Sequence, residues 1–141
     1  MIAYFDTSAI ISLIIEEPSS AVTSRLWDDA ERIVSVRVLY PEARAALARA
    51  ERMRRVTRGQ LTAAIAELES IIGQVDHIEI NAPLARLAGD LAQTHGLRGY
   101  DAVHLAAAAT AADNELVVVT GDSDLGRAAT ALGISTAVTT R

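Results

Sequence analysis

Four carboxylate residues stand where a parallel α/β fold gathers its functional side chains. Asp6 and Asp122 each follow a short apolar run of the kind expected for a buried parallel strand. Ligands of open α/β sheets bind outside the carboxyl ends of the strands, so residues directly after a strand are the first candidates for chemistry. Glu42 and Asp101 begin expected helices, which start on that same side of the sheet. We therefore expect Asp6, Glu42, Asp101 and Asp122 to converge on one edge.

A purely structural explanation exists for each of these acids. Aspartates at 6, 101 and 122 have the residue type that caps helices, and Glu42 favours a helix N-terminus electrostatically. Capping alone, however, does not require four acids at strand and helix ends.

Convergence of these carboxylates predicts a bound divalent cation. Their mutual repulsion would raise some of their pKa values unless a cation neutralised them, and hard oxygen ligands select magnesium, with manganese as the alternative. A metal-bound water can then attack a phosphodiester, so the expected reaction is metal-assisted hydrolysis. Ser8 and Thr120 stand beside two of the acids and could position a water or a phosphate oxygen, although local turn and cap bonding explains them equally well. Asp124 is a further acid near this site.

Composition excludes several other classes of protein. The absence of cysteine removes disulfides, thiolate zinc sites and cysteine nucleophiles. The absence of lysine argues against phospho-acceptor receivers and aspartate-nucleophile phosphatases, whose known patterns need a lysine. No glycine-rich dinucleotide or ATP-binding loop is present either.

The charge distribution leaves room for a nucleic-acid partner. A net charge of −5 would normally argue against phosphate binding. Six of the arginines nevertheless fall in the span 44–58, which holds only one acidic residue: Arg44, Arg49, Arg52, Arg54, Arg55 and Arg58. We call this set the arginine stripe. It predicts RNA contacts next to Glu42, with a solvated helix face as the alternative explanation.

Apolar periodicity predicts strands that alternate with helices, hence a mainly parallel sheet in one α/β domain over residues 1–141. The expected strands are 2–5, 33–36, 77–80, 116–120 and 134–138. The expected helices are 9–15, one after Ser19 and Ser20 with Val22, Leu26 and Ala30 as its stripe, one from Pro41 to about 54, one from Thr57 to Gly73, 83–95, 101–112 and 124–132.

No segment predicts membrane insertion or export. The longest uncharged apolar run, 9–15, is too short to span a bilayer, and the N-terminus lacks the features of a signal peptide. We therefore expect a soluble cytoplasmic protein.

Four motifs resemble the PIN-domain family, and in particular the toxin nucleases of bacterial type II toxin-antitoxin pairs of the VapBC kind. They are Tyr-Phe-Asp-Thr-Ser-Ala at 4–9, Tyr-Pro-Glu-Ala-Arg at 40–44, Gly-Leu-Arg-Gly-Tyr-Asp-Ala-Val-His-Leu-Ala at 96–106 and Val-Thr-Gly-Asp-Ser-Asp-Leu at 119–125. The third motif is the most specific of the four. The resemblance spans nearly the whole chain in the expected order.

This resemblance implies a three-layer α/β/α nuclease whose acidic site is formed by Asp6, Glu42, Asp101 and Asp122. Asp6 and Asp101 would be the principal magnesium ligands, and RNA would be cut to leave a 5′-phosphate and a 3′-hydroxyl. Relatives commonly form homodimers, and a small antitoxin silences them by laying its C-terminal segment over the active-site groove.

Two other functions remain open. One is a catalytically inactive RNA-binding or regulatory PIN module, although intact acids at all four positions argue against it. The other is a metal-independent ribonuclease that uses two of His77, His95 and His104 as acid and base. We expect His104 to have a packing role instead, because alanine and leucine surround it at helical spacing. The RNA substrate stays undetermined.

Overall fold

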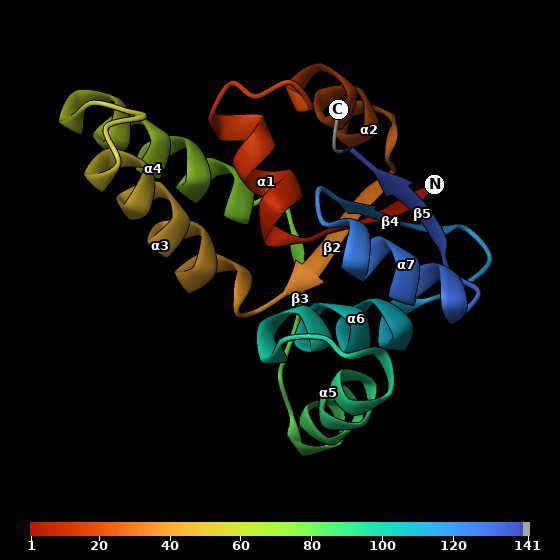
Figure 1. Ribbon diagram of the computed structural model, residues 1–141. Coiled ribbons are helices and arrows are strands. Elements are labelled where there is room, and N and C mark those ends of the chain that lie inside the picture. The colour runs from red at the N-terminus through yellow and green to blue at the C-terminus, as the bar shows by residue number, and fades with distance from the viewer. Residues whose placement is uncertain (140–141) are drawn as a thin grey trace.

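The computed structural model describes residues 1–139 as alternating strands and helices (Figure 1). The strands are β1 (Ile2–Phe5), β2 (Arg32–Val36), β3 (Asp76–Ile78), β4 (Leu116–Thr120) and β5 (Ser135–Val138). The helices are α1 (Thr7–Ile14), α2 (Ser20–Asp29), α3 (Leu39–Arg52), α4 (Arg58–Ile72), α5 (Ala82–His95), α6 (Gly99–Ala111) and α7 (Ser123–Ala131). None of these helices is long and apolar enough to cross a membrane.

All five strands run parallel in one sheet of order β3-β2-β1-β4-β5. The first strand is therefore the central one, with Tyr4 paired to Val34 of β2 on one side and Phe5 paired to Val119 of β4 on the other. Because the strands are parallel, their carboxyl ends lie at the same edge of the sheet. Asp6, directly after β1, lies in the middle of that edge.

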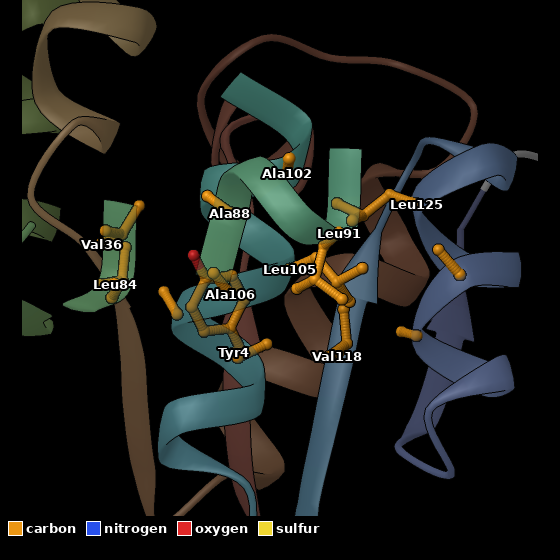
Figure 2. Packing of buried hydrophobic residues seen from close by; sticks show 14 of the residues in the cluster. Tyr4, Val36, Leu84, Ala88, Leu91, Ala102, Leu105, Ala106, Val118 and Leu125 are labelled. Carbon is orange, nitrogen blue, oxygen red and sulfur yellow. The ribbon is translucent and has the colours of Figure 1, made fainter. Parts of the chain in front are cut away.

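Helices cover both faces of the sheet, which confirms the three-layer α/β/α architecture (Figure 1). Alternation along β1 divides the core between the two faces. Tyr4 belongs to the cluster that joins β2 and β4 to α5, α6 and α7, and it lies there with Leu105 and Val118 (Figure 2). Ala3 and Phe5 belong to the opposite cluster, with α1, α3 and α4.

The helices α3 and α4 form a hairpin that extends away from the sheet (Figure 1). A capping box begins α4, as predicted from Thr57: the Thr57 hydroxyl accepts from the Gln60 backbone N–H (3.1 Å), and the Gln60 side chain accepts from the Thr57 N–H (2.8 Å). The arginine stripe lies on this hairpin, along α3, in the turn after it and at the start of α4.

The predicted apolar stripe of α2 is confirmed at Leu26 and Ala30, which pack against the core, and is wrong at Val22. Val22 is 39% exposed, whereas Ser20 and Thr23 are buried. Both hydroxyls can be buried because each donates to a backbone carbonyl, Ser20 to that of Ser12 (2.7 Å) and Thr23 to that of Ser19 (2.8 Å). Helical spacing of apolar residues therefore identified this helix and part of its buried side, but not the burial of the two hydroxyl residues.

Several predicted element boundaries differ from the structure by one or two residues; α1, for example, begins at Thr7 and α6 at Gly99. The helix α3 begins at Leu39, so Pro41 is its third residue and not its first. Proline is tolerated there because the first N–H groups of a helix have no partner within the helix. The third strand begins and ends earlier than predicted, covering Asp76–Ile78.

Candidate active site

Asp6 is the buried carboxylate at the centre of the sheet edge, with 4% of its surface exposed. It ends β1 and caps α1, since its Oδ1 accepts from the Ala9 backbone N–H (3.0 Å) and also from the Ser8 hydroxyl (2.7 Å). Its Oδ2 accepts from the Thr120 hydroxyl at 2.5 Å. Burial raises the pKa of Asp6, and the charge of His104 and these hydrogen bonds offset that effect only in part.

Thr120 joins the ends of the two central strands. Its hydroxyl donates to Asp6 and accepts from the Asp122 backbone N–H at 2.9 Å. Next to it, the Gly121 N–H donates to the Ser8 hydroxyl at 2.8 Å. A Cβ atom at Gly121 would lie 3.3 Å from that Ser8 oxygen, so this close approach favours glycine. Ser8 and Thr120 thus hold Asp6 and the loop after β4 together.

Asp122 acts as the N-cap of α7. Its Oδ1 accepts from the backbone N–H groups of Asp124 (2.8 Å) and Leu125 (3.3 Å). The Asp124 carboxylate instead pairs with Arg127 on the exposed side of α7. Of the two acids after β4, Asp122 is the one whose charge acts on Asp101.

Glu42 lies in the first turn of α3 and is half-buried. Its Oε1 accepts from the Thr7 hydroxyl (2.7 Å) and contacts Nε2 of His104 (2.7 Å). Burial alone would raise the pKa of Glu42, but the hydrogen bond and charge of His104, together with the Thr7 hydroxyl, outweigh burial and lower it.

Asp101 lies in the first turn of α6, where the Arg98 guanidinium approaches it at 3.4 Å. Burial and the nearby charge of Asp122 raise the pKa of Asp101, and Arg98 offsets this only in part. Asp101 and Glu42 also line one cleft of about 710 Å³ with Tyr100 and residues of α5. Asp101 is thus close enough to Asp122 for their charges to interact, and it lines the same cleft as Glu42.

The fit of a metal ion depends on how these acids are arranged. Their oxygen donors suit a hard divalent cation, and the raised pKa values of Asp6 and Asp101 show carboxylates whose charge is poorly compensated. As the side chains stand, no three acidic or histidine residues of the span 1–139 form a ready-made metal-binding group. Magnesium does not require one, because it keeps several waters and is bound through one or two carboxylates.

The arginine stripe is exposed along α3 and the turn that follows it. Arg44 lies over the ring of Tyr40, 5.7 Å from its centroid, and donates to the Tyr40 hydroxyl at 2.8 Å. Arg55 pairs with Glu17 at 3.4 Å. Arg49 and Arg52 form no ion pair with any residue of 1–139, which leaves their charge available to a partner.

Sequence reasoning missed the polar role of two residues. His104 is buried, as its apolar neighbours predicted, yet both of its ring nitrogens have polar partners, Tyr4 and Glu42. The signal that could have identified it was its place three residues after Asp101. Thr7 carried no signal of its own, because its pattern is that of an ordinary residue at a helix start.

The histidines do not form an acid-base pair in the structure. His104 is buried beneath the acids, His77 lies in β3 with its Nε2 at 3.2 Å from the Ile72 carbonyl, and His95 ends α5. No hydrogen bond within residues 1–139 joins one histidine to another. This geometry gives no support to a metal-independent histidine ribonuclease.

The structure is a parallel three-layer α/β/α domain with acids along one sheet edge, and comparison with known proteins identifies its family. The model of the PIN domain matches residues 3–131. The chain therefore belongs to the PIN domain family.

Comparison with individual proteins narrows this assignment. The chain is 41% identical over 132 residues to Ribonuclease VapC49 of Mycobacterium tuberculosis, covering 94% of this chain and 92% of that protein. It thus lies among the VapC ribonucleases of the family.

Solved structures share the fold at low sequence identity. Mycobacterium tuberculosis VapC20, described as a sarcin-ricin loop cleaving toxin, superposes with a TM-score of 0.68 at 19% identity, covering 94% of this chain and 95% of that one. The complex VapBC2 of Rickettsia felis, bound to a DNA fragment from its promoter, gives a TM-score of 0.67 at 14% identity and 98% coverage of both chains.

Proposed function

We propose that this chain is a magnesium-dependent endoribonuclease, the toxin of a type II toxin-antitoxin pair, with Asp6, Glu42, Asp101 and Asp122 as its acidic site. The observation that carries the proposal is the sheet edge itself. There Thr120 joins Asp6 to the loop that bears Asp122, and Glu42 and Asp101 line one cleft. The kinship with VapC ribonucleases supports RNA as the substrate.

By analogy with the family, Asp6 and Asp101 would hold the cation; burial opposes the negative charge of both, and Asp122 adds repulsion at Asp101. Bound Mg²⁺, or Mn²⁺ in its place, would activate a water and polarise a phosphate oxygen. Ser8 and Thr120 orient Asp6 through their hydroxyls. In hydrolysis the water oxygen bonds to phosphorus as the P–O3′ bond breaks, and the 3′ oxygen takes up a proton, leaving a 5′-phosphate and a 3′-hydroxyl.

The proposed partner of this nuclease is a cognate antitoxin. The structural similarity to the VapBC2 complex agrees with such a pairing, since that complex holds a toxin with its antitoxin. The 710 Å³ cleft beside Asp101 offers a place for an antitoxin segment to cover the acids. A homodimer in the cytoplasm completes the proposal, by analogy with the family.

The test is cleavage of a pool of structured RNAs by the purified, antitoxin-free chain, with magnesium, with EDTA and with Asp101→Asn in parallel. The pool includes a sarcin-ricin loop oligonucleotide, the target named for VapC20. We expect cleavage with magnesium and its loss in both other arms. Cleavage that survives EDTA would favour the histidines, and no cleavage of any RNA would favour the inactive RNA-binding module.

A further inference from the structure

His104 is a buried polar residue that the proposed chemistry does not yet use. It lies on α6 with 3% of its surface exposed, one turn after Asp101. Its Nδ1 is 2.8 Å from the Tyr4 hydroxyl, and its Nε2 is 2.7 Å from Oε1 of Glu42. The Thr7 hydroxyl, 3.2 Å from the same Nε2, also donates to that Glu42 oxygen.

The chemistry of these groups fixes the direction of the hydrogen bonds. An ionised carboxylate only accepts, so Nε2 of His104 must carry the proton that it shares with Glu42. Nδ1 lies 2.8 Å from the Tyr4 hydroxyl, from which a neutral ring accepts and to which a protonated ring donates, so the bond to Glu42 has the same direction in either form. Tyr4 is fully buried in the core, so the chain of bonds runs from the core of the molecule to Glu42.

Packing alone does not account for a histidine at this position. Its neighbours Ala102, Leu105 and Ala106 are buried and apolar, so packing against them does not itself require an imidazole. Burying an imidazole is unfavourable unless its nitrogens find partners. Both nitrogens of His104 do find them, and one of the partners is a residue of the acidic edge.

We infer that His104 is a positioning residue: together with Thr7 it holds Oε1 of Glu42, so that Oε2 is the oxygen presented to the cleft. This inference rests on the proposed function, in which Glu42 acts on the cation and its waters. Within residues 1–139 no hydrogen bond engages Oε2 of Glu42. One oxygen is thus held by two donors and the other is left for a ligand, which is how partners behind a site orient the groups that bind metal.

The first test needs neither metal nor substrate. In the metal-free chain, ¹⁵N-resolved NMR should show the His104 Nε2–H as a slowly exchanging signal, because this proton is buried and hydrogen-bonded. Glu42→Gln should shift that signal strongly, and the control His95→Gln should not. An Nε2–H signal indifferent to Glu42→Gln would overturn the inference and leave the proposed nuclease intact.

The second test measures what the held carboxylate does. With Mn²⁺ as the probe in calorimetry, His104→Leu should weaken binding by about 10- to 100-fold, the usual effect of removing a partner of a metal ligand. His104→Gln, which keeps a donor toward Glu42, should recover most of that loss, and Tyr4→Phe should have the smaller effect. Thermal unfolding checks that each variant folds, and His104→Gln keeps the test decisive if His104→Leu does not.

A double variant separates positioning from a structural role. If His104 acts through Glu42, then His104→Leu should add no further loss of Mn²⁺ affinity in a Glu42→Gln background. An equal loss in both backgrounds would mean a structural role and would overturn the inference. A wild-type chain that neither binds Mn²⁺ nor cleaves RNA would overturn the proposed function, and this inference with it.

Discussion

Asp6 and Asp101 lie in surroundings that oppose a negative charge. Burial raises the pKa of both, and Asp122 adds repulsion at Asp101. A carboxyl whose pKa is higher in the folded than in the unfolded chain binds more protons when folded. Its contribution to stability is therefore complete at low pH and is lost as pH rises from the unfolded pKa through the raised folded pKa.

Replacing Asp101 tests whether its ionised carboxylate lowers the stability of the folded chain. At pH 7 without metal, Asp101→Asn should have a higher Tm than the wild-type chain, and the difference should vanish in acid, where Asp101 is protonated. Added Mg²⁺ should stabilise the wild type by about 2.7 kcal/mol when it reaches roughly 100 times its Kd. The Asn variant should gain much less.

Asp28→Asn on the exposed surface of α2 is the matched control. Its Tm should follow that of the wild type with and without Mg²⁺. A lower Tm for Asp101→Asn at pH 7 in the absence of metal would contradict the proposed strain at the acidic edge.

Sequence reasoning located the acids but not the groups that orient them. Asp6 and Asp122 could be placed because an acid after a buried strand has a defined position in a parallel sheet. The bond between Thr7 and Glu42 joins residues 35 positions apart, and that between His104 and Glu42 joins residues 62 apart. Such pairings depend on how three helices pack, which no local pattern records.

At the scale of elements, local sequence patterns predicted which helices and strands exist better than which of their residues are buried. Thr57 and Gly96 both end up as predicted helix boundaries, the latter in the left-handed conformation (φ 65°) that favours glycine. The burial of Ser20 and Thr23 on α2 could not be predicted, because it depends on their bonds to backbone carbonyls. Hydropathy takes no account of such bonds.

The contact between α7 and β5 yields a prediction about packing. A Cβ atom at Gly126 would lie 2.5 Å from Cγ2 of Val138, a distance at which the Val138 side chain or the backbone that carries it must shift. Gly126→Ala should therefore destabilise the chain, because overpacking costs about 1–3 kcal/mol and exceeds the helix propensity gained, about 1 kcal/mol. Chemical denaturation measures the difference.

Removing the Val138 methyl group should reverse the sign of the stability change that Gly126→Ala causes. In a Val138→Ala background, Gly126→Ala should stabilise the chain by about 1 kcal/mol, because only the propensity gain remains. Gly89→Ala is the control, since a Cβ there meets no atom within 4 Å. Destabilisation by Gly126→Ala of equal size in both backgrounds would show that Val138 is not the obstacle.

For the whole molecule, the arginine stripe is a locally basic region in a chain whose overall charge is −5. Arg49 and Arg52 are exposed on α3, the helix that carries Glu42. Charge reversal at both positions should weaken RNA binding and make its dependence on log salt less steep, since each phosphate contact contributes a slope of about −0.7 for single strands. Titration of labelled RNA at several salt concentrations measures both quantities.

The control for this prediction is charge reversal at Arg25 and Arg86, which are exposed on α2 and α5. These changes alter the net charge equally but leave the arginine stripe intact. An RNA affinity that falls to the same extent in both double variants would mean that net charge, and not the arginine stripe, governs binding.

The central position of β1 has a consequence for the newly made chain. This strand is synthesised first, yet one of its two neighbours is β4, and the hydroxyl that holds Asp6 belongs to Thr120 at the end of β4. Until residues 116–120 leave the ribosome, β1 lacks its neighbour β4, and Asp6 lacks its hydrogen bond from the Thr120 hydroxyl. Pairings between distant segments form late because loop closure opposes them. In the proposed nuclease, a site built in this order forms only after β4 has been synthesised, so the ribosome that makes it is not exposed to a working nuclease while the elements before β4 are being made.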